Sequence, residues 1–351
     1  MSTSLNITAI TGGDNEPSAR FRVRQYIHGL AEHDINVNEN YPFIAKSGRY
    51  WYHKYPFLAQ ILPQLGTAGL RIATRLPAII ESYKTNLTWI QREFLTAFST
   101  TEGLTKSPRV FDVDDAIWLR LKATESFAKK IVRRMDGLVC GNSWLADYFS
   151  DCNTPTWVIP TGVDTERWRS GFLTPRENLY IGWIGTSGNY RYLYEIEQAL
   201  FQFFKKFASA KLFVIADSPP NFSYLSEKNV QFFPWSQDIE VQAVQQMHIG
   251  IMPLQDSDWE RGKCSFKMLL YMSIGLPVVV SPVGMNREIL QKGRVGFGPR
   301  NHSEWMDALT SLAVSPELRK QMGSRGREVV EQYYSVKKIV PQLVDVFHSF
   351  L

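Results

Sequence analysis

Three cations crowd the start of an apolar segment in the second half of the chain. The stretch ERGKCSFKMLLYMSIGLPVVVSPVG, residues 260–284, carries Arg261, Lys263 and Lys267 ahead of a predicted buried helix, a glycine stop and a buried strand. The N-terminal end of a helix is already positive, so cations are normally found at its other end. We therefore predict that Lys263, Lys267 and the helix N–H groups bind a dianionic phosphate. The alternative is a solvated loop, but the apolar run FKMLLYM leaves little solvent around Lys267.

Two other loops lie between a predicted strand and a predicted helix, where backbone N–H groups can approach a phosphate. Gly12 and Gly13 follow the strand 5–10, although two glycines are more often just a turn. The loop after the strand 179–185 is polar and leads into a helix with a further cation; its candidate residues are Thr186, Ser187, Asn189 and Arg191. Small hydroxyl residues with exposed N–H groups suit a phosphate. The alternative is ordinary helix capping by Ser187 or Asn189.

Carboxylates gather at the end of another predicted strand, in VFDVDDAIWL. Asp112, Asp114 and Asp115 repel one another unless a cation, hydroxyls or backbone donors offset their charge. We expect Asp115 to cap a helix that begins at Ala116, and Asp114 to accept sugar hydroxyls. A D-x-D pair can also hold a divalent metal, which is the lesser alternative.

Charge also gathers near the first loop, where Arg20, Arg22 and Arg24 open a predicted helix. Alternating arginines of this kind are typical of a solvated surface, so they add little to a phosphate site by themselves. The loop also lacks the G-x-G-x-x-G pattern and an acidic partner for a ribose, which argues against a dinucleotide-binding oxidoreductase.

Composition narrows the class of protein. The chain has 351 residues, 44% hydrophobic and 21% charged, and fits two globular domains better than one. Its net charge of +5 suggests anionic partners without choosing between nucleic acid, phosphorylated ligands and a lipid surface. Three cysteines without a C-x-x-C pair and six scattered histidines argue against a disulfide framework or a metal site, with a reducing cytosol as the default. We see no signal peptide and no apolar run of about 18 residues.

Apolar strands alternate with amphipathic helices, which predicts α/β architecture with parallel sheets covered on both faces. The predicted strands are 5–10, 109–113, 136–141, 156–160, 179–185, 211–216, 230–234, 249–254 and 277–282. Helices are expected over 19–32 and 117–134, among others. The pattern restarts after a linker, so we place one Rossmann-like domain at 1–165 and a second at 175–334. Ligands of such sheets bind beyond the carboxyl ends of the strands.

The region 50–83 interrupts the first domain with aromatic, aliphatic and basic residues and no acid until Glu81. Pro and Gly divide it into short helices. Tyr and Trp beside scattered cations suit a membrane interface, so we predict peripheral membrane contact here. The alternative is an ordinary helical insertion that packs on the first domain.

Together these motifs resemble the GT-B glycosyltransferases, specifically the family 4 retaining type that acts in bacterial polysaccharide or lipid-linked glycan synthesis. The resemblance covers nearly the full length, and its most specific combination is VIPTGVD followed by GLPVV and GMNREI. The other matching segments are GGDNEPSARFRVRQYIHGL, VFDVDDAIWL, CGNSWLADYF, IGWIGTSGNYRYL, FFPWSQDIEVQAV, IGIMPLQDSDWERGKCSFK and GFG.

The resemblance implies the GT-B fold, with two Rossmann-like domains whose parallel sheets face a central cleft. The first domain would bind the acceptor and the second a nucleotide sugar, and a C-terminal helix, here 335–351, would cross back to the first domain. Such enzymes need no metal or other cofactor, because basic side chains and helix N-termini neutralise the leaving diphosphate. Lys263 and Lys267 resemble those cations, with Arg191 a third.

The resemblance also assigns further site residues. Gly12 and Gly13 would approach the diphosphate from the first domain. Asp114 matches a position near the sugar that is often a histidine. Trp235, in FFPWSQ, is expected to lie near the base of the donor.

Two glutamates typical of the family are absent. Alignment on SIGLPVV places them at Gly262 and Leu270. The second usually holds the donor ribose, and Glu288 is the candidate to replace it. The first usually lies near the sugar, where Glu260 or Asp258 could substitute through a shifted loop.

We therefore predict a retaining, metal-independent glycosyltransferase of the hexosyl type. It would move a sugar from a nucleoside diphosphate donor to a glycan or lipid-linked acceptor in cell-surface polysaccharide (lipopolysaccharide) biosynthesis. The expected location is the cytoplasm, at the inner face of the cell membrane, without a nucleic-acid partner. The alternatives are a nucleotide-sugar epimerase or hydrolase of the same fold, and a non-catalytic partner subunit that binds nucleotide sugars.

Overall fold

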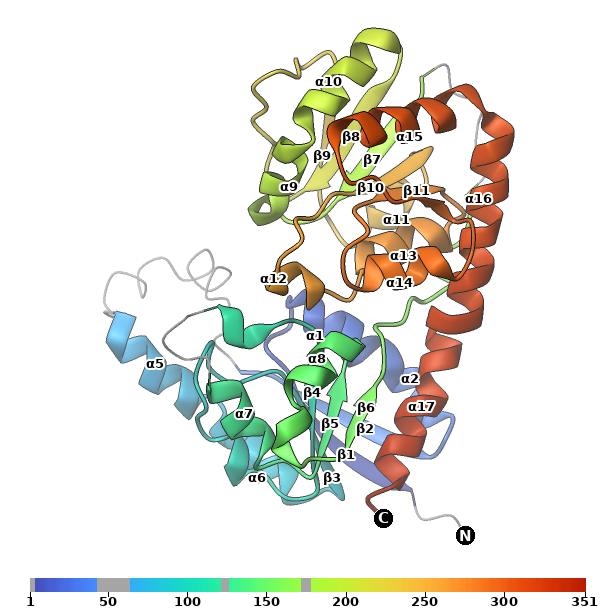
Figure 1. Ribbon diagram of the computed structural model, residues 1–351. Helices are drawn as coiled ribbons and strands as arrows, with labels where there is room; N and C mark the ends of the chain where they lie inside the picture. Colours follow the sequence, from blue (N-terminus) through green and yellow to red (C-terminus); the bar gives the residue numbers. More distant parts are fainter. Residues whose placement is uncertain (1–3, 43–63, 121–125, 172–177) are drawn as a thin grey trace. The chain divides into compact units, whose positions relative to one another are not determined.

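The chain divides into two compact units, shown in Figure 1. The computed structural model describes residues 4–42, 64–120, 126–171 and 178–351. The first unit comprises residues 1–162, 262–264 and 336–351, and the second comprises 163–261 and 265–335. Each unit holds a six-stranded sheet whose pairings are all parallel. The predicted α/β class with two Rossmann-like units is confirmed.

The sheet of the first unit has the strand order β2-β1-β3-β4-β5-β6. Its strands are β1 (Leu5–Ile10), β2 (Ile35–Asn40), β3 (Leu87–Gln91), β4 (Arg109–Val113), β5 (Gly137–Cys140) and β6 (Thr156–Val158). The inner strands are buried along nearly their whole length, as expected of a parallel sheet covered on both faces. The strand order reverses between β1 and β3, and such a switch point is where ligands of open α/β sheets bind.

Short helices surround this sheet. They are α1 (Pro17–Arg22), η1 (Arg24–Tyr26), α2 (Ile27–Ala31), α5 (Gln64–Ala73), α6 (Leu76–Ser82), η2 (Glu102–Leu104), η3 (Ile117–Leu119), α7 (Phe127–Val132), α8 (Ser143–Tyr148), η5 (Ser150–Cys152) and α17 (Val336–His348). The predicted helix 19–32 is therefore three short pieces. Of the predicted helix 117–134, residues 121–125 lie outside the described residues.

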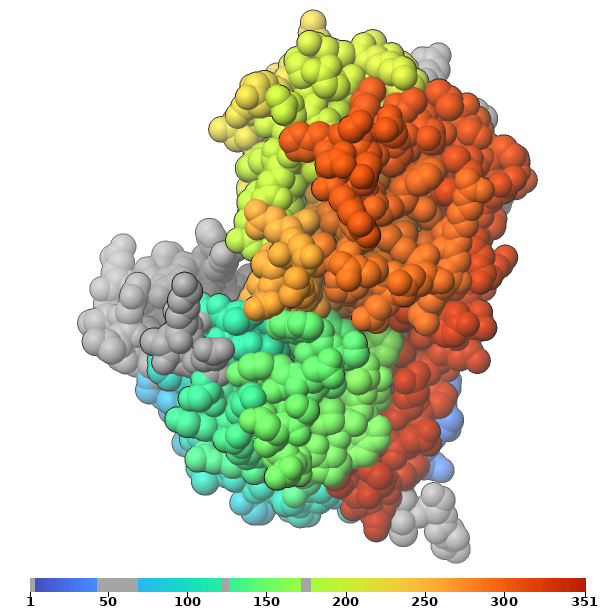
Figure 2. Space-filling view, in the orientation of Figure 1, coloured from blue at the N-terminus to red at the C-terminus, as the bar shows by residue number. Residues whose placement is uncertain are grey.

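The C-terminal helix α17 belongs to the first unit, as the fold class implied, and lies beside α2 (Figure 1). Its apolar face, which includes Ile339, Leu343 and Phe347, is fully buried in the core of this unit. At the end of the chain Phe350 packs edge-to-face on Trp157, with ring centroids 5.9 Å apart. Figure 2 shows this red segment along the side of the first unit, next to the green residues.

The sheet of the second unit has the order β12-β11-β10-β7-β8-β9, so its switch point lies between β7 and β10. Its strands are β7 (Tyr180–Ile184), β8 (Lys211–Ala216), β9 (Val230–Pro234), β10 (Ile249–Met252), β11 (Val278–Val280) and β12 (Gly296–Phe297). Its helices are η6 (Ser187–Asn189), α9 (Tyr190–Glu195), α10 (Glu197–Lys206), α11 (Glu240–Val244), α12 (Asp258–Arg261), α13 (Phe266–Ser273), α14 (Met285–Gln291), α15 (His302–Val314), α16 (Pro316–Val329) and the π-helical turn η7 (Val330–Tyr334).

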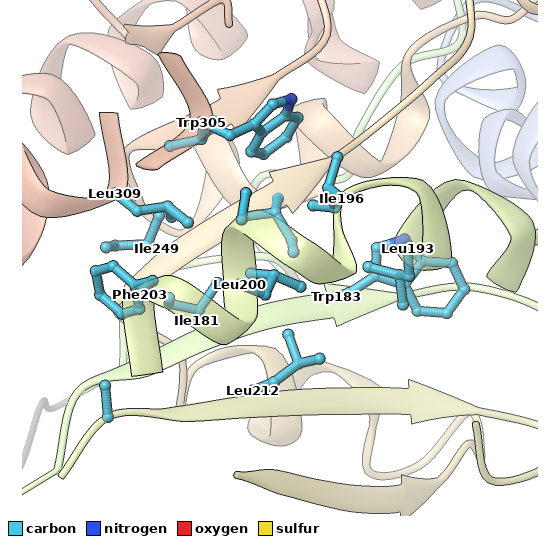
Figure 3. Packing of buried hydrophobic residues seen from close by; sticks show 14 of the residues in the cluster. Ile181, Trp183, Leu193, Ile196, Leu200, Phe203, Leu212, Ile249, Trp305 and Leu309 are labelled. Atoms are coloured by element: carbon cyan, nitrogen blue, oxygen red, sulfur yellow. The ribbon is translucent and has the colours of Figure 1, made fainter. Parts of the chain in front are cut away.

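The core of the second unit forms where α10 and α15 pack on the sheet (Figure 3). Leu200 and Phe203 of α10 have no exposed surface and lie above apolar strand residues such as Ile181. Leu309 of α15 is buried in the same cluster. This packing fixes the strands whose carboxyl ends carry the candidate site.

The sequence prediction missed three strands. β2 reads INVNEN and is an edge strand that alternates apolar and polar residues. β3 is five residues long and lies in the middle of the first sheet, while β12 has only two residues. The short, polar or isolated character of these segments hides them from a search for longer apolar runs.

Candidate active site

The loop after β7 is held by an aspartate that directly follows the neighbouring strand β8. Ser187 donates from its backbone N to Oδ1 of Asp217 at 2.6 Å and from its hydroxyl to Oδ2 at 2.7 Å. The Asn189 side chain donates to Oγ1 of Thr186 at 2.8 Å, and neither Ser187 nor Asn189 caps a helix with its side chain. The alternative of ordinary capping is therefore wrong for both. The loop has a fixed shape at the carboxyl edge of the sheet.

Lys267 lies in the first turn of α13 and reaches the end of β7. Its Nζ is 4.3 Å from the centroid of the Trp183 ring. A Cβ on Gly185 would come within 2.5 Å of this Nζ, so the glycine makes room for the lysine. A cation, a helix N-terminus and the loop at 186–189 are thus brought to the switch point of the second sheet. Binding of a phosphate at this place stays a prediction.

Arg191 has a carboxylate partner. Its guanidinium donates to the Tyr192 hydroxyl at 2.6 Å and to Oε1 of Glu260 at 3.2 Å. Glu260 is buried, and its carboxylate also accepts from the hydroxyls of Tyr192 and Ser257. Burial, followed by the hydrogen bond to Glu260, raises the pKa of Tyr192 to about 12. Glu260 therefore anchors α12 to α9, and Asp258 is an exposed partner of Arg261.

Trp235 and Glu288 lie on other elements of the second unit. Trp235 directly follows β9, is 45% exposed and donates from Nε1 to Oε2 of Glu240 at 3.1 Å. Glu288 is exposed in the first turn of α14. Its charge adds to the effect of burial in raising the pKa of Tyr334. The assigned roles of Trp235 with the base and of Glu288 with the ribose stay predictions.

In the first unit, Gly12 and Gly13 follow β1. Asp112, the first of the three predicted carboxylates, is buried on β4. Asp112 forms two hydrogen bonds with Arg22, at 2.8 and 2.9 Å. Arg22 is 1% exposed, so the expectation of solvated arginines is wrong for this residue. Burial alone would lower the pKa of Arg22, but the charge and hydrogen bonds of Asp112 raise it above its ordinary value.

Arg92 offsets the other two carboxylates. Its Nε is 2.5 Å from Oδ1 of Asp114, and its Nη2 is 2.6 Å from Oδ2 of Asp115. Burial by itself would raise the pKa of Asp114, but Arg92 outweighs it and holds this pKa below its ordinary value. The expected capping of a helix by Asp115 is wrong, because η3 begins at Ile117 after Ala116 and has no side-chain cap. The sequence correctly required a countercharge here but did not identify it.

The segment 262–264 brings Lys263 to the same region of the first unit. The Cys264 thiol contacts the backbone oxygen of Asp114 at 3.2 Å, and Asn142 donates to the backbone oxygen of Lys263 at 3.2 Å. A Cβ on Gly262 would lie 2.8 Å from the Cβ of Ala116, which explains why no glutamate stands here. The other position, Leu270, is 4% exposed in the core of the second unit.

Arg92 is a functional candidate that sequence analysis did not identify, and Arg22 is one that it interpreted as a solvated surface residue. Arg92 has φ of 63°, a left-handed conformation that turns its side chain away from the course of β3. Its partners are 22 and 23 residues away in the sequence, so no local spacing reveals the cluster. The only available signal was the carboxylate group itself, which demands a cation.

The part of the chain that the structure describes contains no group of side chains suited to bind a metal ion, and its cysteines form no disulfide. No three His, Cys, Asp or Glu side chains are grouped there so that they could hold a metal ion. The three cysteines, Cys140, Cys152 and Cys264, are all buried and free of disulfides. Burial is also the main cause of the raised pKa of the Cys264 thiol. Within the same described ranges, no helix is both long and apolar enough to cross a bilayer.

The insertion at 50–83 is described only in part, because residues 50–63 lie outside the described residues. In α6, Leu76, Ile80 and Tyr83 at its end are between 50% and 63% exposed and follow helical spacing. Arg75, in contrast, is buried, donates to the Thr11 oxygen and has a pKa lowered to about 10 by burial. This arginine holds the insertion to the loop after β1.

Comparison with known proteins identifies the second unit. Residues 178–314 match the family model described as glycosyl transferases group 1. No curated protein matches the sequence.

Solved structures match nearly the whole chain at low sequence identity. HepE from Anabaena in complex with UDP-glucose has a TM-score of 0.69 at 13% identity, covering 98% of this chain and 100% of that one. Sucrose-phosphate synthase from Thermosynechococcus elongatus has a TM-score of 0.68 at 14% identity, with 98% of each chain covered. A trehalose-6-phosphate protein from E. coli, bound with UDP-2-fluoro glucose, has a TM-score of 0.66 at 11% identity, covering 97% and 98%.

At these identities the likeness establishes the fold, and the family match establishes the class of the second unit. The two six-stranded parallel sheets and the returning C-terminal helix agree with that fold. The chain has the GT-B fold, and its residues 178–314 match the glycosyl transferases group 1 family.

Proposed function

We propose that the protein is a retaining, metal-independent glycosyltransferase that moves a hexose from a UDP-sugar to a glycan or lipid-linked acceptor in cell-surface polysaccharide biosynthesis. The observation that carries the proposal is the position of Lys267 over Trp183, beside Gly185 at the carboxyl end of β7. The choice of uridine follows from the ligands named for the HepE and E. coli structures.

The proposed donor site uses charge rather than a metal. As the glycosidic bond to the donor breaks, negative charge develops on the leaving diphosphate. The ammonium group of Lys267 and the N–H groups at the start of α13 are already oriented before the reaction. They therefore stabilise the charge that develops in the transition state. The loop at 186–189, which Asp217 holds, supplies further backbone donors at the same edge of the sheet. Arginine partners for Asp112, Asp114 and Asp115 support the metal-independent route.

In the first unit, the proposed roles belong to the loop at Gly12 and Gly13, to Asp114 and to Lys263. Asp114 stays ionised, because Arg92 lowers its pKa, and an ionised carboxylate accepts hydrogen bonds from sugar hydroxyls. Lys263 is the cation that we propose for phosphate binding in this unit. No epimerase or partner-subunit role is favoured by an observation on these residues.

We also propose that α6 contacts the cytoplasmic face of the cell membrane. Leu76, Ile80 and Tyr83 form an exposed apolar row on this helix. The check is co-sedimentation with vesicles of phosphatidylcholine and phosphatidylglycerol, comparing the intact protein with an Ile80→Glu, Tyr83→Glu double variant. Equal binding of the two proteins would contradict the proposal.

The main experiment measures release of UDP from UDP-glucose, UDP-galactose and UDP-N-acetylglucosamine with and without a membrane-lipid extract, in the presence of EDTA. We expect release that depends on one donor and on the extract, and NMR of the product should show retained anomeric configuration. A changed sugar without any acceptor would instead indicate an epimerase, and free sugar a hydrolase. Absence of both turnover and donor binding would refute the proposed function.

A further inference from the structure

A small polar cavity lies at the switch point of the first sheet, between the ends of β1 and β3. Its volume is about 90 Å³, and its lining includes Gly12, Glu16, Ser18, Gln91, Thr96 and Arg120. Gly12 follows β1 and Gln91 ends β3, which pair side by side in the sheet. Ligands of open α/β sheets bind at such a place, outside the carboxyl ends of the strands.

Gln91 has polar atoms that the protein does not satisfy. The residue is 2% exposed, yet neither its Oε1 nor its Nε2 has a hydrogen-bond partner. Nearly all buried polar side-chain atoms in proteins have a partner, because leaving one unpaired costs free energy. The amide lines the cavity, so its partner enters from there.

The charges around the cavity favour a neutral occupant. Arg92, which also lines it, already pairs with Asp114 and Asp115. Arg120 lies 3.7 Å from the buried carboxylate of Glu93. An anion would therefore compete with carboxylates that hold both guanidinium groups, and it would also lie near Glu16.

The mixture of donors and acceptors suits hydroxyl groups. An amide donates and accepts, and so does a hydroxyl, whereas arginine only donates and a carboxylate only accepts. A volume of about 90 Å³ has room for a few water molecules, each of which occupies about 30 Å³ in the liquid. This space admits the edge of a sugar ring with two or three hydroxyls.

We propose that this cavity is an acceptor subsite, in which Gln91 binds the hydroxyl-bearing edge of a neutral sugar. The inference rests on the proposed function, since it names the chemistry of the acceptor for that reaction. Gln91 exchanges hydrogen bonds with one hydroxyl, and Thr96 and Ser18 bind its neighbours. The left-handed turn at Arg92 ends β3 directly after Gln91, and both residues line the cavity.

The test titrates the full-length protein, in the presence of UDP, with methyl α-glucoside, methyl α-mannoside, methyl α-galactoside and inorganic phosphate, and follows binding by saturation-transfer NMR. Gln91→Met keeps the length of the side chain but removes both polar atoms. Gln342→Met is the matched control, because Gln342 is exposed on α17 of the same unit. Thermal unfolding of each variant is recorded in parallel.

We expect wild type and Gln342→Met to bind at least one methyl hexoside equally, and Gln91→Met to bind it at least tenfold more weakly. If Gln91→Met does not fold, Thr96→Val removes a partly exposed hydroxyl of the same cavity and should weaken binding about threefold. Binding of no hexoside by wild type, or equal binding by all variants, would mean that the cavity holds only water. Phosphate binding that depends on Gln91 would show that the cavity takes an anion rather than a neutral sugar.

A donor titration separates this inference from the proposed function. If the protein binds UDP-glucose but no hexoside at the cavity, the subsite is wrong and the proposed function stands. If it binds neither, both are wrong. Gln91→Met should bind UDP-glucose as wild type does, because Gln91 is not among the residues proposed to bind the donor.

Discussion

Arg22 and Asp112 form a bidentate ion pair in the interior of the first unit, with side chains 1% and 0% exposed. Arg22 comes from α1 and Asp112 from β4, 90 residues along the chain. The same guanidinium donates to the backbone oxygen of Ile159 at 2.8 Å, just beyond β6. One arginine thus joins three segments at the carboxyl edge of the sheet.

Replacing Arg22 with Met should lower the free energy of unfolding by about 3–5 kcal/mol, because it leaves the buried carboxylate of Asp112 without a cation. Urea denaturation measures this loss. Arg133→Met is the control, since Arg133 forms an exposed ion pair with Asp151 at 3.4 Å and should cost about 1 kcal/mol or less. Equal costs for the two substitutions would show that the buried pair has no special weight.

Lys267→Ala should reduce turnover of the donor by about 100-fold, the scale of losing one preorganised charge contact in the transition state. The readout is the rate of UDP release at saturating donor. Lys206→Ala is a suitable comparison, because Lys206 also lies over an aromatic ring, at 5.6 Å from the centroid of Phe207, but on α10. Near-normal turnover by a folded Lys267→Ala protein would show that the diphosphate does not bind at Lys267.

Asp114 should make stability depend on pH at the acid end. Its pKa is below the ordinary value in the folded protein, so its ionised form contributes stability that is fully present above the unfolded pKa of about 3.9. This contribution is lost as the pH falls through the folded pKa.

Urea denaturation from pH 7 to pH 3 should therefore show wild type more stable than Asp114→Asn at neutral pH, with a difference that shrinks below about pH 4. Asp147→Asn serves as the control, since Asp147 is an exposed aspartate on α8 of the same unit. A constant difference across the range would mean that the titration of Asp114 is not linked to folding.

Gly262→Ala should destabilise the protein by about 1–3 kcal/mol through overpacking. The new methyl group would lie 2.8 Å from the Cβ and 3.0 Å from the backbone N of Ala116, and backbone atoms do not move aside cheaply. Gly69→Ala in α5 meets no atom within 4 Å and should be neutral or stabilising by up to about 1 kcal/mol. Thermal unfolding of the two variants distinguishes these outcomes, and a stable Gly262→Ala protein would remove the steric explanation for the missing glutamate.

The sequence predicted the architecture because long apolar strands such as 211–216 survive as buried strands with the same bounds. It also predicted a polar loop after the strand that ends at Gly185 and a lysine in the first turn of a helix that begins near Ser265, since glycine, hydroxyl residues and cations are local signals. It failed where a residue takes its role from distant partners. Arg92 is placed by a left-handed turn and by carboxylates that directly follow another strand, β4. Gln91 stands out only because its buried amide has no hydrogen-bond partner.

Arg22 illustrates a second limit. Its neighbours Arg20 and Arg24 are partly exposed, and the alternating pattern indicated solvent for all three. The helix is only six residues long, however, so one turn suffices to direct one arginine into the interior. Only the tertiary position of Asp112 decides which one is buried.

The helix α17 has a consequence for the order in which the chain folds during synthesis. The second unit lies wholly within residues 163–335, apart from the segment 262–264, and is complete once those residues have emerged. The first unit begins the chain but lacks Ile339, Leu343 and Phe347 until its last helix is made. The N-terminal unit therefore emerges first as an unfinished core, which closes only after the whole second unit has been made.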